Sequence, residues 1–159
     1  MQSDIGKLSS AIRNELYESY YDFFLTQQDV GETSLSELLV LPRGQVISES
    51  AYSGSSARRI IIPNTYHTIS SEAFAACRRL LRITIPDSVV VVGSSAFWNC
   101  DVLNEIVIGE GLRFVDVNAF SNCYALERVF YKGTEEQWDK INIGSGNSYL
   151  TNAEIYFNS

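Results

Sequence analysis

A repeat of 23 residues runs through the middle of the chain and constrains its fold more than any other feature. The motif Ala-Phe-x-x-Cys occurs three times, and its cysteines are Cys77, Cys100 and Cys123. A leucine follows each cysteine at the same interval, at Leu80, Leu103 and Leu126. Because equal steps along a repeat become equal steps in space, we predict a stack of similar coils in which like residues form columns.

The same register extends through the residues between these motifs. Two sets of aligned apolar positions are Ile60, Ile83, Ile106 and Val129, and then Ile62, Ile85, Ile108 and Tyr131. A weaker copy precedes them, from Leu39-Val40-Leu41-Pro42 to Ala51-Tyr52, with its spacing shortened by one or two residues. We therefore expect about four coils over residues 38–133, the first of them degenerate.

Each coil combines two local patterns. Ile83-Thr84-Ile85 alternates like a half-buried strand, and Pro86-Asp87 ends it with a turn. Residues 94–100 begin with serines that can cap a helix, and Ala96, Phe97 and Cys100 are spaced to face inward from one or two helical turns. A single coil cannot bury this apolar face alone, so the coils must stack. The prediction is an α/β repeat, a short solenoid with a parallel sheet on one face.

Residues 1–30 are predicted to form an amphipathic helix. Its apolar stripe follows steps of three and four residues, at Ile5, Leu8, Ile12, Leu16, Tyr20 and Phe23. One interpretation is a cap over the first coil, because terminal coils otherwise expose apolar surface. The other is a docking or self-association helix, since aromatic residues are enriched at interfaces. The candidate docking residues are Tyr17, Tyr20, Tyr21, Phe23 and Phe24.

Residues 134–159 are predicted to close the other end of the stack. Thr134-Glu-Glu-Gln137 has the pattern of a capping box that opens a short helix. Trp138 follows at a position from which it can cover the last coil, and residues 154–157 can add a final strand. We interpret this region as a C-terminal cap.

The strand face provides the candidate binding site. If Ile83 and Ile85 point inward, Arg82 and Thr84 point outward, and the repeat carries this alternation to the other coils. The outward positions form two columns: Arg59, Arg82, Glu105 and Arg128, and then Ile61, Thr84, Val107 and Phe130. The columns are either a structural ladder around Glu105 or a recognition patch, since arginines beside apolar and aromatic residues are typical of interfaces.

The three cysteines are interpreted as buried thiols. Their equal spacing places each at the same internal position of successive coils, whereas a zinc site needs four ligands that converge on one point. A free cysteine in such a position behaves as a small hydrophobic residue. We therefore expect no metal site.

The sequence also predicts no enzyme and no cofactor. His67 is the one histidine, expected in an exposed turn, and no nucleophile or carboxylate is placed to work with it. Gly-rich phosphate loops, Gly-x-Ser-x-Gly and His-Glu-x-x-His motifs are absent from the sequence.

Charge and hydropathy exclude two classes of partner. The net charge of −7 would repel phosphate backbones, so nucleic acid is not an expected partner. No apolar run approaches the roughly 20 residues that cross a bilayer, so we expect no membrane insertion. The start of the chain lacks the basic and apolar segments of a secretory signal peptide.

The full pattern, Ala-Phe-x-x-Cys-x-x-Leu-x-x-Ile-x-Ile-Pro-x-x-Val-x-x-Ile/Val-Gly, closely resembles the BspA-like bacterial leucine-rich repeats from about Leu38 to the end. The resemblance implies an extracellular or cell-surface bacterial protein that recognises or adheres to a host, cell-surface or virion protein, and it carries no catalytic residues. Similar repeats occur in bacteriophage proteins. The alternative function is therefore a structural or accessory component of a phage virion or cell-surface complex, docked through the N-terminal helix.

Overall fold

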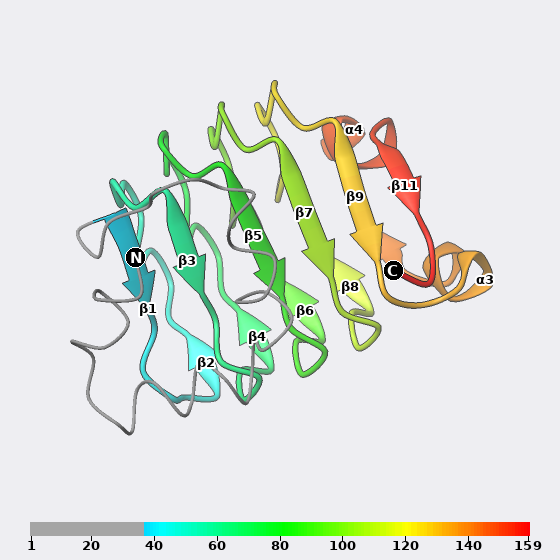
Figure 1. Ribbon diagram of the computed structural model, residues 1–159, viewed down its shortest axis with the longest axis horizontal. Coiled ribbons are helices and arrows are strands. Elements are labelled where there is room, and N and C mark those ends of the chain that lie inside the picture. Colours follow the sequence, from blue (N-terminus) through cyan, green and yellow to red (C-terminus); the bar gives the residue numbers. More distant parts are fainter. Residues whose placement is uncertain (1–36) are drawn as a thin grey trace, which may run out of the picture.

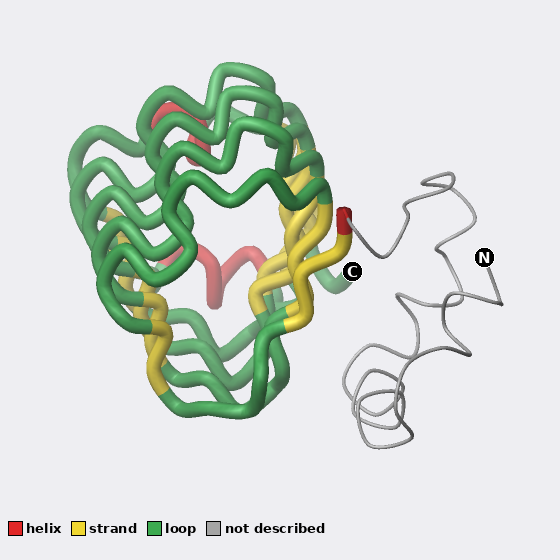
Figure 2. Tube along the Cα trace, turned by 90° about the vertical axis from the view of Figure 1, so that its left-hand side faces the viewer, coloured by secondary structure: helices red, strands yellow, loops and turns green. Residues whose placement is uncertain are grey.

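Residues 37–159 are the part of the chain that the computed structural model describes. They wind as a solenoid whose coils place strands in two parallel sheets on different sides of the stack (Figures 1 and 2). The amphipathic helix predicted for residues 1–30, with its candidate docking residues, lies outside the described residues. The predicted leucine-rich-repeat solenoid is confirmed.

The larger sheet has six parallel strands, one from each successive turn of the chain. In spatial order they are β1 (Leu38–Val40), β3 (Arg59–Ile61), β5 (Arg82–Ile85), β7 (Glu105–Ile108), β9 (Arg128–Tyr131) and β11 (Glu154–Tyr156). Ile83 pairs with Ile106, and Ile106 pairs with Val129, as the repeat predicts. The first step is shorter, since Leu38 pairs with Arg59, two positions short of the 23-residue period.

A second parallel sheet of five short strands was not predicted. It consists of β2 (Val46–Ile47), β4 (Thr68–Ile69), β6 (Val91–Val92), β8 (Phe114–Val115) and β10 (Asn142–Ile143). Each of these strands has two residues, one directed inward and one outward, as Phe114 (exposed) and Val115 (buried) illustrate. A segment of two residues is too short to show a period in the sequence, which is why the repeat alone did not reveal this sheet.

The helix predicted for residues 94–100 is wrong, and the structure has consecutive turns there. The N–H groups of Ala96, Trp98 and Cys100 donate to carbonyls three residues earlier, at 3.2, 3.0 and 3.2 Å. Ser95 and Asn99 have φ angles of 56° and 60°, which an α-helix of L-residues does not accommodate. The amides between the turns bond instead to the next coil, so that stacking replaces helical hydrogen bonds. The solenoid therefore contains little helix.

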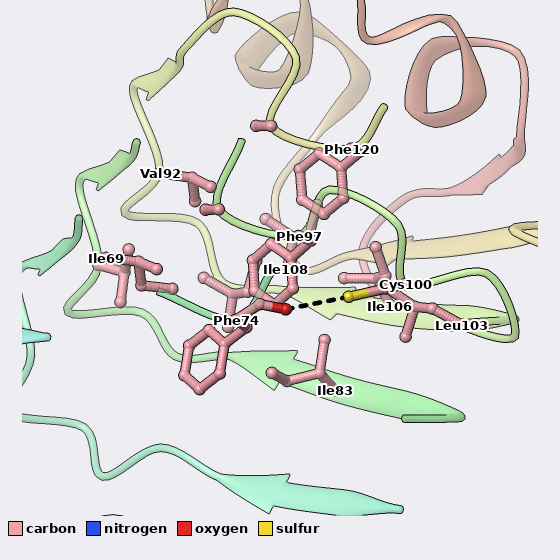
Figure 3. Packing of buried hydrophobic residues seen from close by; sticks show 14 of the residues in the cluster. Ile69, Phe74, Ile83, Val92, Phe97, Cys100, Leu103, Ile106, Ile108 and Phe120 are labelled. Atoms are coloured by element: carbon pink, nitrogen blue, oxygen red, sulfur yellow. Dashed lines mark hydrogen bonds between the residues drawn. The ribbon is translucent and has the colours of Figure 1, made fainter. Parts of the chain in front are cut away.

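Phenylalanines from successive coils stack at the centre of the core (Figure 3). We call Phe74, Phe97 and Phe120 the phenylalanine column; their ring centroids are 5.3 and 5.1 Å apart and all three side chains are fully buried. Inward residues of both sheets, such as Ile83 and Val92, belong to the same apolar cluster. The column runs along the solenoid axis and ties each coil to the next.

The cysteines form a second buried column, as predicted. Cys100 Sγ donates a hydrogen bond to the Phe74 carbonyl at 3.2 Å, and Cys123 Sγ donates to the Phe97 carbonyl at the same distance. Neither thiol is part of a disulfide. Burial raises the pKa of Cys123 to about 12, and a hydrogen bond with Cys77, reinforced by burial, raises the pKa of Cys100. Cys100 and Cys123 therefore act as protonated core groups.

The solenoid has about five coils, one more than predicted, because the segment that follows β9 completes another turn. This segment contains α3 (Glu135–Asp139), β10 and α4 (Ser148–Thr151), and the chain then returns as β11 beside β9. The predicted capping box is present, with reciprocal hydrogen bonds between Thr134 and Gln137. Trp138 is buried edge-to-face against Tyr131, with ring centroids 5.3 Å apart.

Candidate binding face

The outward side of the larger sheet brings six of the predicted site residues into two rows. Strand register aligns Arg82 with Glu105 and Glu105 with Arg128, and it aligns Thr84 with Val107 and Val107 with Phe130. All six side chains are partly exposed. We call these residues, Arg82, Thr84, Glu105, Val107, Arg128 and Phe130, the strand face.

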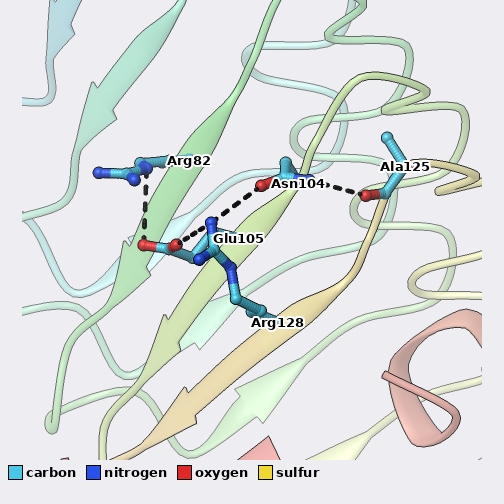
Figure 4. Close-up of polar contacts among 5 residues, drawn as sticks. All are labelled: Arg82, Asn104, Glu105, Ala125 and Arg128. Atoms are coloured by element: carbon cyan, nitrogen blue, oxygen red, sulfur yellow. Dashed lines mark hydrogen bonds and ion pairs between the residues drawn. The ribbon is translucent and has the colours of Figure 1, made fainter. Parts of the chain in front are cut away.

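The first row is an ion-paired ladder (Figure 4). The Glu105 carboxylate lies 3.5 Å from Arg82 Nε and 3.1 Å from Arg128 Nη2, so it forms ion pairs with two guanidinium groups. Asn104 extends the network, since its Oδ1 lies 3.5 Å from Arg128 Nη2 and its Nδ2 donates to the Ala125 carbonyl. Partly exposed pairs of this kind contribute about 0.2–1 kcal/mol each, and their larger effect is to hold the arginines in place.

The second row is apolar and ends in an aromatic pair. Phe130 stacks on Tyr156 of β11, with ring centroids 4.9 Å apart. A hydrogen bond with the Glu154 carboxylate raises the pKa of Tyr156 above its ordinary value. The sequence analysis did not include Tyr156 in the site. Alternation along the predicted final strand places Tyr156 and Glu154 on the same side of that strand. The register of Tyr156 with Phe130 does not follow the 23-residue repeat, so the sequence alone did not bring the two together.

Two predicted site residues do not contribute accessible surface. Arg59 and Ile61 lie in register with Arg82 and Val40, but each is only 2 % exposed. The prediction of an exposed position is therefore wrong for both residues, because alternation determines where a side chain points and not how much solvent reaches it. Burial, together with the charges of Arg82 and Arg58, lowers the pKa of Arg59 to about 10. Among the predicted site residues, accessible side chains begin at β5.

Other predicted features of the site can also be placed. His67 is exposed in the turn before β4. Among residues 37–159 no group of three or more His, Cys, Asp or Glu side chains is arranged to hold a metal ion. The helices of this part of the chain are too short or too polar to cross a membrane.

A comparison with protein-family models identifies the family of the repeat. The sequence model of the BspA type leucine rich repeat region matches residues 32–150 in six copies. The chain belongs to the BspA-type leucine-rich-repeat family. Leucine-rich repeats of this family are generally protein-interaction modules of bacterial surface proteins, and the family and fold are typically non-catalytic.

Three solved structures share the fold of this leucine-rich-repeat protein. A leucine rich cell surface protein from Faecalibacterium prausnitzii matches with a TM-score of 0.58 and 23% identity over 69% of this chain and 36% of that chain. A T. pallidum leucine rich repeat protein matches with a TM-score of 0.61 and 28% identity over 70% and 53% of the two chains.

The third structure, a leucine-rich repeat protein from Bacteroides ovatus, matches with a TM-score of 0.56 and 18% identity over 77% of this chain and 38% of that chain. The match therefore spans between 36% and 53% of the lengths of the three solved chains. A search of curated proteins found no match.

Proposed function

We propose that this leucine-rich-repeat protein is a non-catalytic module that binds a protein partner through the strand face and the adjoining Tyr156. The observation that carries the proposal is the pairing of an ion-paired row with an apolar, aromatic row on a single accessible sheet. Aromatic residues and arginine are the side chains most enriched at interface centres. The non-catalytic part of the proposal rests on the family, whose members are typically non-catalytic.

The backbone beneath the strand face is suited to binding because it is held in place before a partner arrives. Its strands are paired in register, and their inward residues Ile83, Ile106 and Val129 are packed in the core. A rigid surface loses little conformational entropy when it binds, so more of the contact energy remains as affinity. The same reasoning applies to Arg82 and Arg128, which Glu105 already orients.

The chemistry of the two rows defines the kind of partner. Arg82 and Arg128 keep N–H groups that can donate to carboxylates or carbonyls of a partner, since a guanidinium has five donors. Val107, Phe130 and Tyr156 offer apolar and aromatic contact beside them. We therefore expect the partner to present an apolar side chain flanked by acidic or carbonyl groups.

We further propose that this recognition takes place at a bacterial surface, as adhesion or as binding to another surface protein. The family's general role supports this, and one protein of similar fold is described as a leucine rich cell surface protein.

A binding comparison with matched variants tests the proposal. The full chain is immobilised, the surface protein that it retains most strongly is purified, and its Kd is measured by surface plasmon resonance. Phe130→Ala combined with Arg82→Ala should raise the Kd about 30-fold or more, the effect of losing interface anchors. Phe114→Ala, an exposed phenylalanine of the second sheet, serves as the control and should leave the Kd unchanged. Equal retention of the partner by both variants would exclude the strand face as the binding site.

A further inference from the structure

The second row of the strand face continues onto the last strand of the larger sheet. Strand register aligns Thr84 with Val107, Val107 with Phe130, and Phe130 with Tyr156. We call these four residues the apolar row. They belong to β5, β7, β9 and β11, which follow one another in that order across the sheet (Figure 1). The row therefore crosses the strands and takes one residue from each of them.

The spacing of the apolar row is that of neighbouring strands. Parallel strands lie about 4.8 Å apart, so the four positions span about 14.4 Å. The aromatic pair at one end agrees with this value, because the ring centroids of Phe130 and Tyr156 are 4.9 Å apart. In-register pairing of the strands fixes the backbone at each position. A partner that contacts the whole row must therefore present side chains at nearly this interval.

An α-helix presents side chains at nearly this interval along one face. It rises about 1.5 Å per residue, so residues i, i+3, i+7 and i+10 lie at about 0, 4.5, 10.5 and 15.0 Å along its axis. The positions of the apolar row lie at about 0, 4.8, 9.6 and 14.4 Å. Each helix position is thus within about 1 Å of a row position. A helix that lies across the strands can therefore contact all four of them at once.

The charged row determines the chemistry of the flank of such a helix. It lies two residues along each strand from the apolar row, at about 6.7 Å, which is within the roughly 10 Å width of a helix. Register continues this row from Arg128 to Glu154, and its middle is internally paired through Glu105. Its accessible ends have opposite charges, since the Arg82 side chain is 35 % exposed and Glu154 is also exposed.

We propose that the partner of the strand face and Tyr156 is an amphipathic α-helix that lies across β5, β7, β9 and β11. Its apolar residues at i, i+3, i+7 and i+10 contact the apolar row. An acidic side chain on its flank faces Arg82, and a basic side chain faces Glu154. The match of spacings and the opposite charges at the two ends support this occupant. The inference rests on the proposed function, because it names the kind of partner that the strand face binds.

Two designed peptides that contain the same residues test the helix. The first has about 16 residues, leucines at i, i+3, i+7 and i+10, and a glutamate and a lysine near opposite ends of one flank, and a side-chain lactam holds it helical. The second lacks the lactam and places the leucines at alternate positions, on one side of an extended chain. Fluorescence anisotropy measures the Kd of each for the full chain. The helical peptide should bind about tenfold more tightly or better, because only its leucines repeat at nearly the spacing of the strands.

Substitutions in the chain locate the bound peptide. Val107→Ala combined with Phe130→Ala removes the centre of the apolar row and should raise the Kd of the helical peptide about tenfold or more. Arg82→Glu should also raise this Kd, and lysine in place of the peptide's glutamate should restore part of the affinity, because both charges are then reversed. Phe114→Ala, on the second sheet, is the matched control and should leave the Kd unchanged. Circular dichroism shows whether each variant is folded.

Three results would overturn the inference. The first is binding of the extended peptide that is as tight as that of the helical peptide, or tighter. The second is binding of the helical peptide that the Val107 and Phe130 substitutions leave unchanged in folded protein, which would place the helix elsewhere. The third is no binding of the helical peptide at about 1 mM, the weakest affinity that a specific contact of this kind should have.

These outcomes are distinguishable from failure of the proposed function. That function is tested with the purified surface protein, whose Kd depends on Phe130 and Arg82 only if the strand face is its binding site. A chain that binds the surface protein through these residues but prefers the extended peptide would keep the proposed function and reject the helix. A surface protein that is insensitive to both substitutions would reject the proposed function itself.

Discussion

At the scale of single residues, the phenylalanine column is where one side chain matters most for stability. Phe97 is fully buried between Phe74 and Phe120, so its loss leaves a cavity that touches three coils. Phe97→Ala should lower the free energy of unfolding by about 3–5 kcal/mol. Urea unfolding followed by circular dichroism measures this change.

The control for that prediction is again Phe114→Ala. Phe114 is half-exposed on the second sheet, so its removal creates no internal cavity and should cost about 1 kcal/mol or less. Similar losses in the two variants would contradict the view that the column ties the coils together.

The buried thiol of Cys123 should make the free energy of unfolding fall at alkaline pH. Burial raises the pKa of Cys123 from its usual 9.0 to about 12, so between these values the folded protein holds a proton that the unfolded chain releases. The contribution of this thiol to the free energy of unfolding is complete below about pH 9 and falls by up to about 1.4 kcal/mol per pH unit above it.

Urea unfolding at several values between about pH 8 and about pH 10.5 tests this dependence. In Cys123→Ala the fall with pH should be shallower than in the wild-type protein, because one of the protonated groups has been removed. Identical slopes would indicate that Cys123 does not hold its proton more tightly in the folded state.

At the scale of elements, the turns of the coil explain why a helix was predicted and not found. The spacing of Ala96, Phe97 and Cys100 fits an inward helical face, but it fits a series of turns equally well. Ser95 and Asn99 decide between the two through their left-handed conformation. Asn adopts that conformation more readily than most residues, but a single Asn in a sequence is too weak a signal to predict it.

Asn99 allows this account to be tested. Asn99 has φ of 60° and its Oδ1 accepts a hydrogen bond from Asn122 Nδ2 at 2.8 Å. Asn99→Gly and Asn99→Val both remove that bond, but only valine is strained at positive φ. The valine variant should therefore unfold with a free energy about 1–2 kcal/mol lower than the glycine variant, as measured by urea unfolding. Equal stability would mean that the turn relaxes without cost.

At the scale of the whole molecule, the period of 23 residues was sufficient to predict the solenoid, the parallel sheet and the two buried columns. Each of these depends on residues that recur at equal intervals. What the period did not reveal was local or terminal: the short strands of the second sheet, and the fifth coil, whose sequence departs from the repeat.

The candidate binding site, like the fold, was predicted from the sequence only in those features that repeat from coil to coil. The two rows of the strand face follow directly from alternation combined with the repeat. The burial of Arg59 and Ile61, which excludes them from the strand face, could not be predicted in this way. Burial depends on the tertiary surroundings of a strand and not on its own sequence pattern. Tyr156 was recoverable from the predicted final strand, once its register with β9 is known.

The parallel register of the larger sheet fixes the spacing at which its outward side chains can contact a ligand that crosses the strands. Residues of one row, such as Val107 and Phe130, belong to neighbouring strands and recur at about 4.8 Å. An extended peptide presents side chains on one side at about 6.7 Å, twice the rise of a strand residue. The two spacings differ by about 1.9 Å at the first step, so an extended ligand that crosses the strands cannot place each of its side chains over a residue of the row.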